Sequence, residues 1–319
     1  MKRFCNTMLA LAALTAASVL TAAPLSAQNF PTQRVTIVVP FGAGSVTDIM
    51  ARILADDLGK RWNQQVIVEN KPGLAGTASV AKAVPDGHTI LLTSNGHTVA
   101  NLVSKSAPFN PVTDFAGVTR VCSVPLYLIG HPGMTAKTLK EVIALAKEKP
   151  GTLNFSSPGL ASTTFIAGAL FRKTAGIKIV HVPFKSAPDA VTAVIRGDAH
   201  MYFAPVNLTK DLAAAGKVRA IAAATEKRIP DMPQVPTFTE AGLPFVYDSW
   251  FGVLAPAAVP RPIIEKLNRD FVASIKSAEV NAKLLAQFVI PVTDTPAAFD
   301  KRIREETANL TQVFKEAGI

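Results

Sequence analysis

Apolar residues recur along the chain in two periods, one typical of strands and one typical of helices. Residues 34–40 form an almost unbroken apolar run, and residues 48–60 carry apolar side chains at the spacing of one helix face: Ile49, Ile53, Leu54 and Leu58. A strand over 65–69, a helix over 74–84 and a strand over 88–93 follow. This order predicts parallel strands joined by right-handed crossovers.

The same rhythm returns in the second half of the chain. The expected elements there are helix 139–147, strand 153–156, helix 163–174, strand 178–183, helix 187–196, strand 199–203, helix 208–215 and strand 218–223. The pattern predicts two α/β units, near residues 28–126 and 127–249. A strand over 249–255 and helices over 262–276, 278–288 and 297–317 complete the chain. This helical tail is too thin for a core of its own, so we expect it to pack on one of the two units.

The first 27 residues have the pattern of a secretory signal peptide. Lys2 and Arg3 precede an apolar run over residues 8–23, and a helix breaker and small residues follow up to Ala27. We expect cleavage after Ala27, with Ala23 as the alternative. A retained membrane anchor is the other interpretation, and the shortness of the apolar run disfavours it.

Composition and charge narrow the class of protein. Of 319 residues, 49% are hydrophobic and 18% are charged, which excludes a disordered polyampholyte. The net charge of +10 falls to +8 when Lys2 and Arg3 leave with the signal peptide. The basic residues are scattered without a run of five, and export argues against nucleic acid, so a diffuse positive field that attracts small organic anions fits better.

Two cysteines exclude a disulfide-rich scaffold. Cys5 leaves with the signal peptide, and Cys122 stands in an apolar, strand-like segment where a small buried side chain is expected.

The loop after the first strand is the first candidate for ligand binding. It contains Phe41, Gly42, Ala43, Gly44, Ser45, Thr47 and Asp48. The nucleotide-binding fingerprint G-x-G-x-x-G would require a third glycine at position 47, where Thr47 stands, so the fingerprint is incomplete. Ser45 and Asp48 form a capping box at the start of a helix, and Asp48 either has that structural role or contacts a ligand. Free backbone N–H groups here are suited to a carboxylate.

Three further loops follow strands and open helices. Their candidate residues are Ser94 and Asn95 in the second loop, Ser157, Gly159, Ala161, Ser162 and Thr163 in the third, and Phe184 in the fourth. These residues are equally suited to turns and N-caps, so a structural role stays open for each. Lys185 faces either solvent or a ligand anion, and Ser186 with Asp189 forms a second capping box.

Signatures of catalysis and of metal binding are missing from the sequence. The five histidines show no H-x-x-x-H pair and no paired cysteines accompany them, so we expect neither a zinc site nor a cofactor. No G-x-S-x-G motif is present. The pattern favours a binding protein over an enzyme, although catalytic residues can converge from distant positions.

Seven motifs taken together resemble the Bug-type, TctC-like extracytoplasmic solute-binding receptors of the tripartite tricarboxylate transporter family. They lie at residues 38–48, 68–73, 85–89, 181–185, 216–220, 233–242 and 250–256. The resemblance implies an α/β, two-domain type II periplasmic-binding-protein (Venus-flytrap) fold with a ligand cleft between the domains. It also implies that the chain crosses between domains twice. Domain 1 would then contain residues 28–126 and 250–319, and domain 2 residues 127–249.

The resemblance further implies a periplasmic monomer that binds a small carboxylate, delivers it to the membrane subunits of the transporter, and needs no nucleic acid or cofactor. Two family positions differ here: Phe165 stands where a histidine is common, and Ala204 where an aspartate is common. This pair favours a ligand with an apolar or aromatic body over an amino acid. The alternatives are an exported receptor that serves a signalling partner and an exported α/β enzyme.

Overall fold

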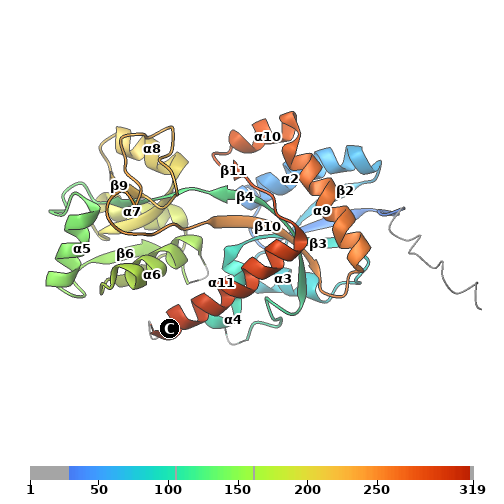
Figure 1. The fold of residues 1–319 in the computed structure, drawn as a ribbon, viewed down its shortest axis with the longest axis horizontal. Coiled ribbons are helices and arrows are strands. Elements are labelled where there is room, and N and C mark those ends of the chain that lie inside the picture. The colour runs from blue at the N-terminus through green and yellow to red at the C-terminus, as the bar shows by residue number, and fades with distance from the viewer. Residues whose placement is uncertain (1–28, 105, 161, 317–319) are drawn as a thin grey trace, which may run out of the picture.

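The chain folds into two β-sheets, each flanked by helices and lying in its own half of the molecule (Figure 1). The structure, a computed structural model, describes residues 29–104, 106–160 and 162–316. The predicted signal peptide and Ala161 of the predicted site lie outside these residues. The mixed α/β class with two units, as expected from the sequence, is confirmed.

The first sheet has six strands in the order β11-β4-β10-β3-β1-β2. Their bounds are β1 Val35–Val39, β2 Val66–Asn70, β3 Thr89–Ser94, β4 Phe115–Val124, β10 Ser249–Pro256 and β11 Ile290–Pro291. The expected parallel arrangement is confirmed for β1 with β2 and β3. In contrast, β10 runs antiparallel to both β3 and β4, so the sheet is mixed.

The second sheet has five strands in the order β7-β6-β8-β5-β9. Their bounds are β5 Leu126–Gly130, β6 Asn154–Ser157, β7 Val180–Pro183, β8 Met201–Pro205 and β9 Arg219–Ala223. Strands β7 and β8 run parallel to β6, whereas β5 runs antiparallel to β8 and β9.

The helices predicted from apolar spacing are present, with ends that differ by a few residues. Their bounds are α2 Val46–Trp62, α3 Leu74–Ala81, α5 Leu139–Glu148, α6 Thr163–Ala175, α7 Ala187–Arg196, α8 Val206–Ala214, α9 Arg261–Lys276, α10 Ala278–Leu285 and α11 Pro296–Glu316. Two short helical elements were not predicted, the 3-10 helix η2 Asn95–Val99 and α4 Ala100–Val103. Within the described ranges no helix is both long and apolar enough to cross a membrane.

Strands β4 and β5 carry the chain from one sheet to the other, and the sequence pattern did not delimit them. In strand β4, Gly117, Thr119 and Arg120 interrupt the apolar pattern from which a buried strand is predicted. Thr119 and Arg120 are nevertheless buried. Leu126 already pairs within the second sheet, and Ser249 pairs within the first. The predicted domain limits at residues 126 and 249 stay a prediction.

The tail does not pack on one unit alone. Helices α9 and α10 pack on α2, as a tail belonging to the first unit would. Helix α11 packs against β4 and also contacts α6 of the second unit, where the rings of Phe314 and Phe165 lie 5.5 Å apart. Helix α11 thus lies mainly on the first unit, as expected for the tail, and adds a contact with the second.

A close approach fixes α11 on the first sheet. A side chain at Gly252 in β10 would collide with the ring of Phe299, so only glycine lets the helix lie this near. Further along α11, two residues one helical turn apart also contact the region of β10. Arg302 pairs with Asp248 at 3.2 Å, and Glu306 accepts a hydrogen bond of 2.7 Å from Trp250 Nε1.

Glu306 gives stability a measurable pH dependence. Burial raises the pKa of its carboxyl from 4.5 to about 7, against hydrogen bonds from Trp250 and Thr98 and the charge of Arg302, which lower it. The folded chain thus holds a proton that the unfolded chain releases, and this contribution to stability is lost as pH rises from about 4.5 through 7.

We expect Glu306→Gln to remove that part of the pH dependence. In urea denaturation, the variant should exceed the wild type in free energy of unfolding by about 1–3 kcal/mol at pH 8 and by little at pH 5. Glu305→Gln, an exposed neighbour on the same helix, is the control and should leave the pH profile unchanged. An unaltered profile in Glu306→Gln would contradict the prediction.

Candidate functional site

The predicted site residues gather at the carboxyl ends of the parallel strands in both sheets. Strands β1 and β3 are parallel, so the loops that follow them lie at the same edge of the first sheet. Strands β6, β7 and β8 place their following loops at one edge of the second sheet in the same way. Helix α6 contacts η2, so the element after β6 meets the element after β3.

The loop after β1 leads directly into the N-terminus of α2. Ser45 is the N-cap, and its Oγ accepts a hydrogen bond of 3.2 Å from the Asp48 N–H. Gly44 has a φ of +78°, a conformation that side chains with a Cβ rarely adopt. Gly42, Ala43 and Gly44 are exposed, whereas the side chain of Thr47 is buried. The loop thus presents backbone rather than side chains to solvent.

Asp48 holds this loop in shape. Its buried carboxylate accepts from the Gly44 N–H at 2.8 Å, from Asn70 Nδ2 at 3.0 Å and from Arg52 at 3.0 Å. Asn70 also donates to the Phe41 carbonyl, which fastens the start of the loop. Burial alone would raise the pKa of Asp48, but the hydrogen bonds from Arg52, Gly44 and Asn70 outweigh it and lower the pKa.

The predicted capping box at Ser45 and Asp48 is therefore present in one half only. The Asp48 carboxylate bonds the N–H of Gly44 instead of that of Ser45. Asn70, which sequence reasoning did not select, completes the arrangement from the end of β2. Contact between Asp48 and a ligand stays a prediction, and a ligand would have to share a carboxylate that already has three partners.

The predicted residues Ser94 and Asn95 lie where β3 ends and η2 begins, and both are buried. Asn95 Nδ2 donates to the hydroxyl of Tyr247 at 2.5 Å, which joins this loop to the segment that returns from the second unit. Tyr247 was not predicted, because nothing in the local sequence indicates a contact with a residue 152 positions away.

The loop after β6 uses its hydroxyl groups internally. Ser162 caps α6: its Oγ accepts from the Phe165 N–H at 3.1 Å and donates to the Gly159 carbonyl at 2.6 Å. The hydroxyl of Ser157 lies 2.7 Å from His181 Nε2. Burial, together with the charge of Arg172, lowers the pKa of His181 to about 4, so this imidazole is neutral near pH 7.

Thr163, Phe184 and Ala204 differ in their access to solvent. Thr163 begins α6 and is partly exposed. Phe184 is partly buried and packs on an apolar cluster that contains Ala204 and Tyr127. Ala204 itself has no exposed surface and pairs with Tyr127 across β8 and β5. Their contact with a ligand stays a prediction.

A cavity of about 220 Å³ lies beside the loops after β1 and β3, and we call it the side cavity. Phe41 and Ser94 of the predicted site line it. The remaining lining residues come from the end of β1, the start of α3, the end of β3, η2, α4 and the segment that follows: Pro40, Gly73, Leu74, Thr77, Thr93, Gly96, His97, Ala100, Val103 and Phe109. Three strand ends of the first sheet thus share one cavity.

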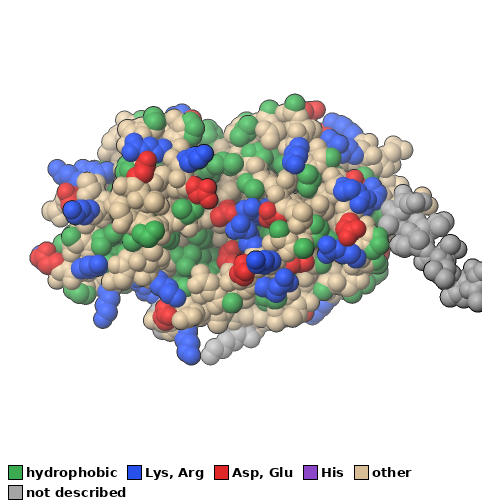
Figure 2. All heavy atoms as spheres, in the orientation of Figure 1, with side chains coloured by type: hydrophobic (Ala, Val, Ile, Leu, Met, Phe, Trp, Pro, Cys, Tyr) green, Lys and Arg blue, Asp and Glu red, His purple; other side chains and the backbone are tan. Residues whose placement is uncertain are grey.

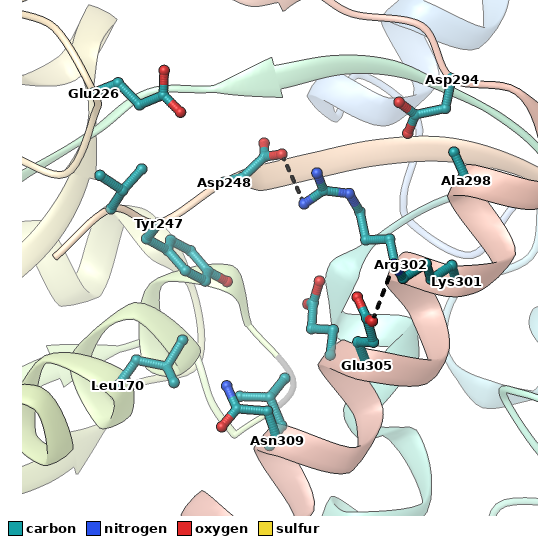
Figure 3. A pocket seen from close by; sticks show the side chains of 13 residues that line it. Leu170, Glu226, Tyr247, Asp248, Asp294, Ala298, Lys301, Arg302, Glu305 and Asn309 are labelled. Carbon is teal, nitrogen blue, oxygen red and sulfur yellow. Dashed lines mark ion pairs between the residues drawn. The ribbon is translucent and has the colours of Figure 1, made fainter.

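Two larger cavities flank the crossing between the units. One of about 710 Å³ is lined largely by residues of α11, four of them charged, and by the segment that contains Tyr247 and Asp248 (Figure 3). The other, of about 650 Å³, includes Arg120, Asp248 and residues 224–230. Charges of both signs meet here, and over the face in Figure 2 the Lys and Arg side chains are spread rather than gathered. Among the residues described, no group of three or more His, Cys, Asp or Glu is placed to hold a metal ion.

Comparison with known proteins identifies a family. The model described as "Tripartite tricarboxylate transporter family receptor" matches residues 50–319. The chain is 33% identical to protein BugT of Bordetella pertussis over 303 residues, 93% of each chain.

Two solved structures from Rhodopseudomonas palustris are similar in fold and sequence. The structure of a protein with adipate has 32% identity and a TM-score of 0.76, and the comparison covers 91% of this chain and 99% of that one. MatC with bound malate has 29% identity and a TM-score of 0.74, with 89% and 100% covered.

We expect Asp48→Ala to destabilise the fold by about 2–4 kcal/mol, because it leaves the Gly44 N–H, Asn70 and Arg52 without their shared acceptor. The lowered pKa means that the wild-type advantage is present above about pH 4 and shrinks as the carboxylate is protonated below it. Urea denaturation at pH 7 and pH 3 measures both effects. Asp56→Ala, an exposed carboxylate on the same helix paired with Lys60, is the control and should change stability little; equal losses in the two variants would refute the role given to Asp48.

Proposed function

This chain belongs to the receptor family of tripartite tricarboxylate transporters, and we propose that it captures a small organic carboxylate in the periplasm and delivers it to the membrane subunits of such a transporter. The observation that carries the proposal is the likeness, over nine-tenths of the chain, to proteins solved with adipate and with malate. In this proposal the protein is exported with cleavage near Ala27, acts as a monomer, and performs no chemistry on its ligand.

The starts of α2 and α6 are suited to hold the carboxylate. Each follows a strand, each begins after a glycine-containing loop, and each leaves backbone N–H groups at the positive end of a helix dipole. Neither loop contains an arginine, and the nearby guanidinium of Arg52 is already paired with Asp48. We therefore infer that neutral N–H donors and hydroxyls, rather than an ion pair, bind the carboxylate.

The wall around the ligand favours an apolar body. Ala204 and Phe165 replace the aspartate and histidine that the family resemblance implies at these positions, and both are buried among apolar side chains. An ammonium group placed there would lack a carboxylate partner. This supports a monocarboxylate or a dicarboxylate with an apolar or aromatic body over an acidic amino acid.

Two connections between the sheets allow ligand binding to act on conformation. The chain crosses at Pro125 and again between β9 and β10, so the halves can close around a ligand and present a closed form to the transporter. The net charge of +8 left after export, spread over the surface, attracts anions from a distance.

Binding of carboxylates by the mature protein tests the proposal. A thermal-shift screen that includes adipate and malate, followed by calorimetry on the hits, should identify a carboxylate with a defined affinity. Ser162→Ala/Thr163→Ala should weaken that carboxylate tenfold to several hundredfold, because it removes the N-cap that fixes the first turn of α6 together with the Thr163 hydroxyl. Charge-assisted hydrogen bonds contribute roughly 1.5–3 kcal/mol each, and water replaces part of the loss.

Gly44→Val should weaken binding more, because Gly44 has a positive φ and a branched side chain blocks approach of the ligand to the backbone. Thr138→Ala removes the N-cap of α5 and is the matched control, with no expected effect on affinity. Unchanged affinity in both the double variant and Gly44→Val would place the carboxylate elsewhere. A screen without any carboxylate hit would reject the receptor function itself.

Salt should slow capture of the ligand more than it weakens final affinity. Exposed charges act over a Debye length of about 8 Å at physiological ionic strength, so higher salt screens their attraction for an anion. Stopped-flow association rates should fall from 20 mM to 500 mM salt, while the dissociation rate changes little. Association rates that stay flat across this range would contradict steering by the surface charge.

A further inference from the structure

Two histidines hold strand β6 through side-chain contacts, one at each end of the strand. At its start, His200 Nδ1 lies 2.8 Å from Asn154 Oδ1. At its end, His181 Nε2 lies 2.7 Å from the hydroxyl oxygen of Ser157. The loop that leads into α6 begins directly after Ser157. Only the second contact therefore lies beside the start of α6.

The hydroxyl of Ser157 connects His181 to the turn before α6. Its oxygen accepts a hydrogen bond of 3.1 Å from the Gly159 N–H and lies 3.3 Å from the Gly159 carbonyl oxygen. That carbonyl accepts a hydrogen bond of 2.6 Å from Ser162 Oγ, and Ser162 caps the helix. A continuous series of hydrogen bonds thus links the imidazole in β7 to the first turn of α6.

Strand β7 also holds the main chain at this point. It is the edge strand of the second sheet and pairs with β6. Directly after β7, the Phe184 N–H donates to the Ser157 carbonyl at 2.8 Å. The backbone after β7 thus fixes the main chain of Ser157, and His181 fixes its side chain.

Aromatic neighbours hold the imidazole of His181. Its ring centroid lies 5.1 Å from that of Phe155 and 4.6 Å from that of Phe165. Burial and the charge of Arg172 lower the pKa of His181 to about 4, so the ring offers no positive charge to an anion near pH 7. A neutral imidazole nitrogen either donates or accepts, and a hydroxyl can match it in both cases. What His181 supplies is therefore a hydrogen bond to Ser157.

We propose that His181 is a positioning residue for the carboxylate site, which acts through Ser157 to hold Gly159 and Ser162 and thereby the first N–H groups of α6. The inference rests on the proposed function, because it concerns the same helix start. Gly159 and Ser162 are partly exposed, so a ligand can approach this turn. Ser157 has no exposed surface, which gives it a role behind the site instead of a ligand contact.

His181 affects affinity without touching the ligand. The first N–H groups of a helix have no partner within the helix, and they bind an anion only where the loop before them leaves them correctly placed. A turn already held in its binding arrangement loses less conformational entropy when the ligand arrives. Release of this turn should weaken binding although every group that contacts the ligand is still present.

Calorimetry at pH 7.5 tests the positioning role. The probes are adipate, malate and benzoate, with any further carboxylate that the thermal-shift screen identifies. His181→Phe keeps a ring between Phe155 and Phe165 but cannot bond Ser157, and it should weaken each acid that the wild type binds by about fivefold to fiftyfold. His181→Gln, whose amide can bond Ser157, should stay within about threefold of the wild type.

His200→Phe is the matched control, because it breaks the contact at the opposite end of β6. Its affinity for the same acids should stay within threefold of the wild type. Should His181→Phe fail to fold, Ser157→Ala breaks the same connection from its other side and should weaken binding to a similar extent. Ser156→Ala, a change of the neighbouring buried serine whose hydroxyl donates to the Ala190 carbonyl, should not.

A double-mutant cycle then measures the connection itself. Because both changes break one series of hydrogen bonds, His181→Phe/Ser157→Ala should add less than twofold to the larger of the two single losses.

The outcomes separate this inference from the function on which it rests. Unchanged affinity in both His181→Phe and Ser157→Ala, an equal loss in His200→Phe, fully additive losses in the cycle, or no recovery in His181→Gln would overturn the positioning role and leave the receptor function intact. A wild type that binds no carboxylate in the wider screen would overturn the receptor function and this inference with it.

Discussion

The ion pairs around Arg120 connect the parts of the molecule that must stay in register at the crossing. This guanidinium is 9% exposed in the middle of β4, paired with Asp248 just before β10 and with Asp294 just before α11. A buried cation without a carboxylate partner would be strongly destabilising. Burial lowers the pKa of Arg120, but the two carboxylates outweigh this and raise it, so the charge is retained. The outgoing strand, the returning strand and the last helix are thus held by one side chain.

The site at the strand ends depends on a different kind of stabilisation. Ser45 and Ser162 satisfy N–H groups in the first turns of α2 and α6, and Asp48 holds the loop between β1 and α2. The hydroxyls of Ser45 and Ser162 and the carboxylate of Asp48 hold the backbone in place. Other backbone N–H groups of the two loops therefore have a fixed position for a ligand. Rigid loops of this kind reduce the conformational entropy lost on binding.

Sequence reasoning succeeded where the governing interactions are local. Apolar spacing located α2, α6 and α7. The serines at the start of α2 and α7 were predicted as caps, whereas the cap of α6 was left open between Ser162 and Thr163. Sequence reasoning did not reach interactions between distant positions. Arg120 and Asp294 are 174 residues apart, and Asn95 and Tyr247 are 152 apart, so neither pair has a local signature. Only the segment around Cys122 was predicted to be strand-like, and the rest of β4 was not delimited. Its buried Arg120 interrupts the apolar pattern and is paired only with distant carboxylates.

The candidate site residues also separate into features set by local sequence and features set by distant partners. Their positions after β1, β3 and β6 followed from the order of elements, which places loops at the ends of parallel strands. The competing uses of each side chain did not follow: Asn70 binds the Asp48 carboxylate from the end of another strand, and His181 occupies the hydroxyl of Ser157. The hydrogen bond between His97 Nε2 and the Pro111 carbonyl did not follow either, because no element was predicted in the stretch around Pro111.

Helix α11 has a mechanical consequence for the receptor. It runs from the first sheet toward α6 of the second unit (Figure 1). It is anchored at Gly252 and touches the second unit through Phe314 and Phe165. A helix in this position bridges the two units. Any rotation that separates the halves must break this contact between two buried rings, and exposing their apolar surface to water costs free energy.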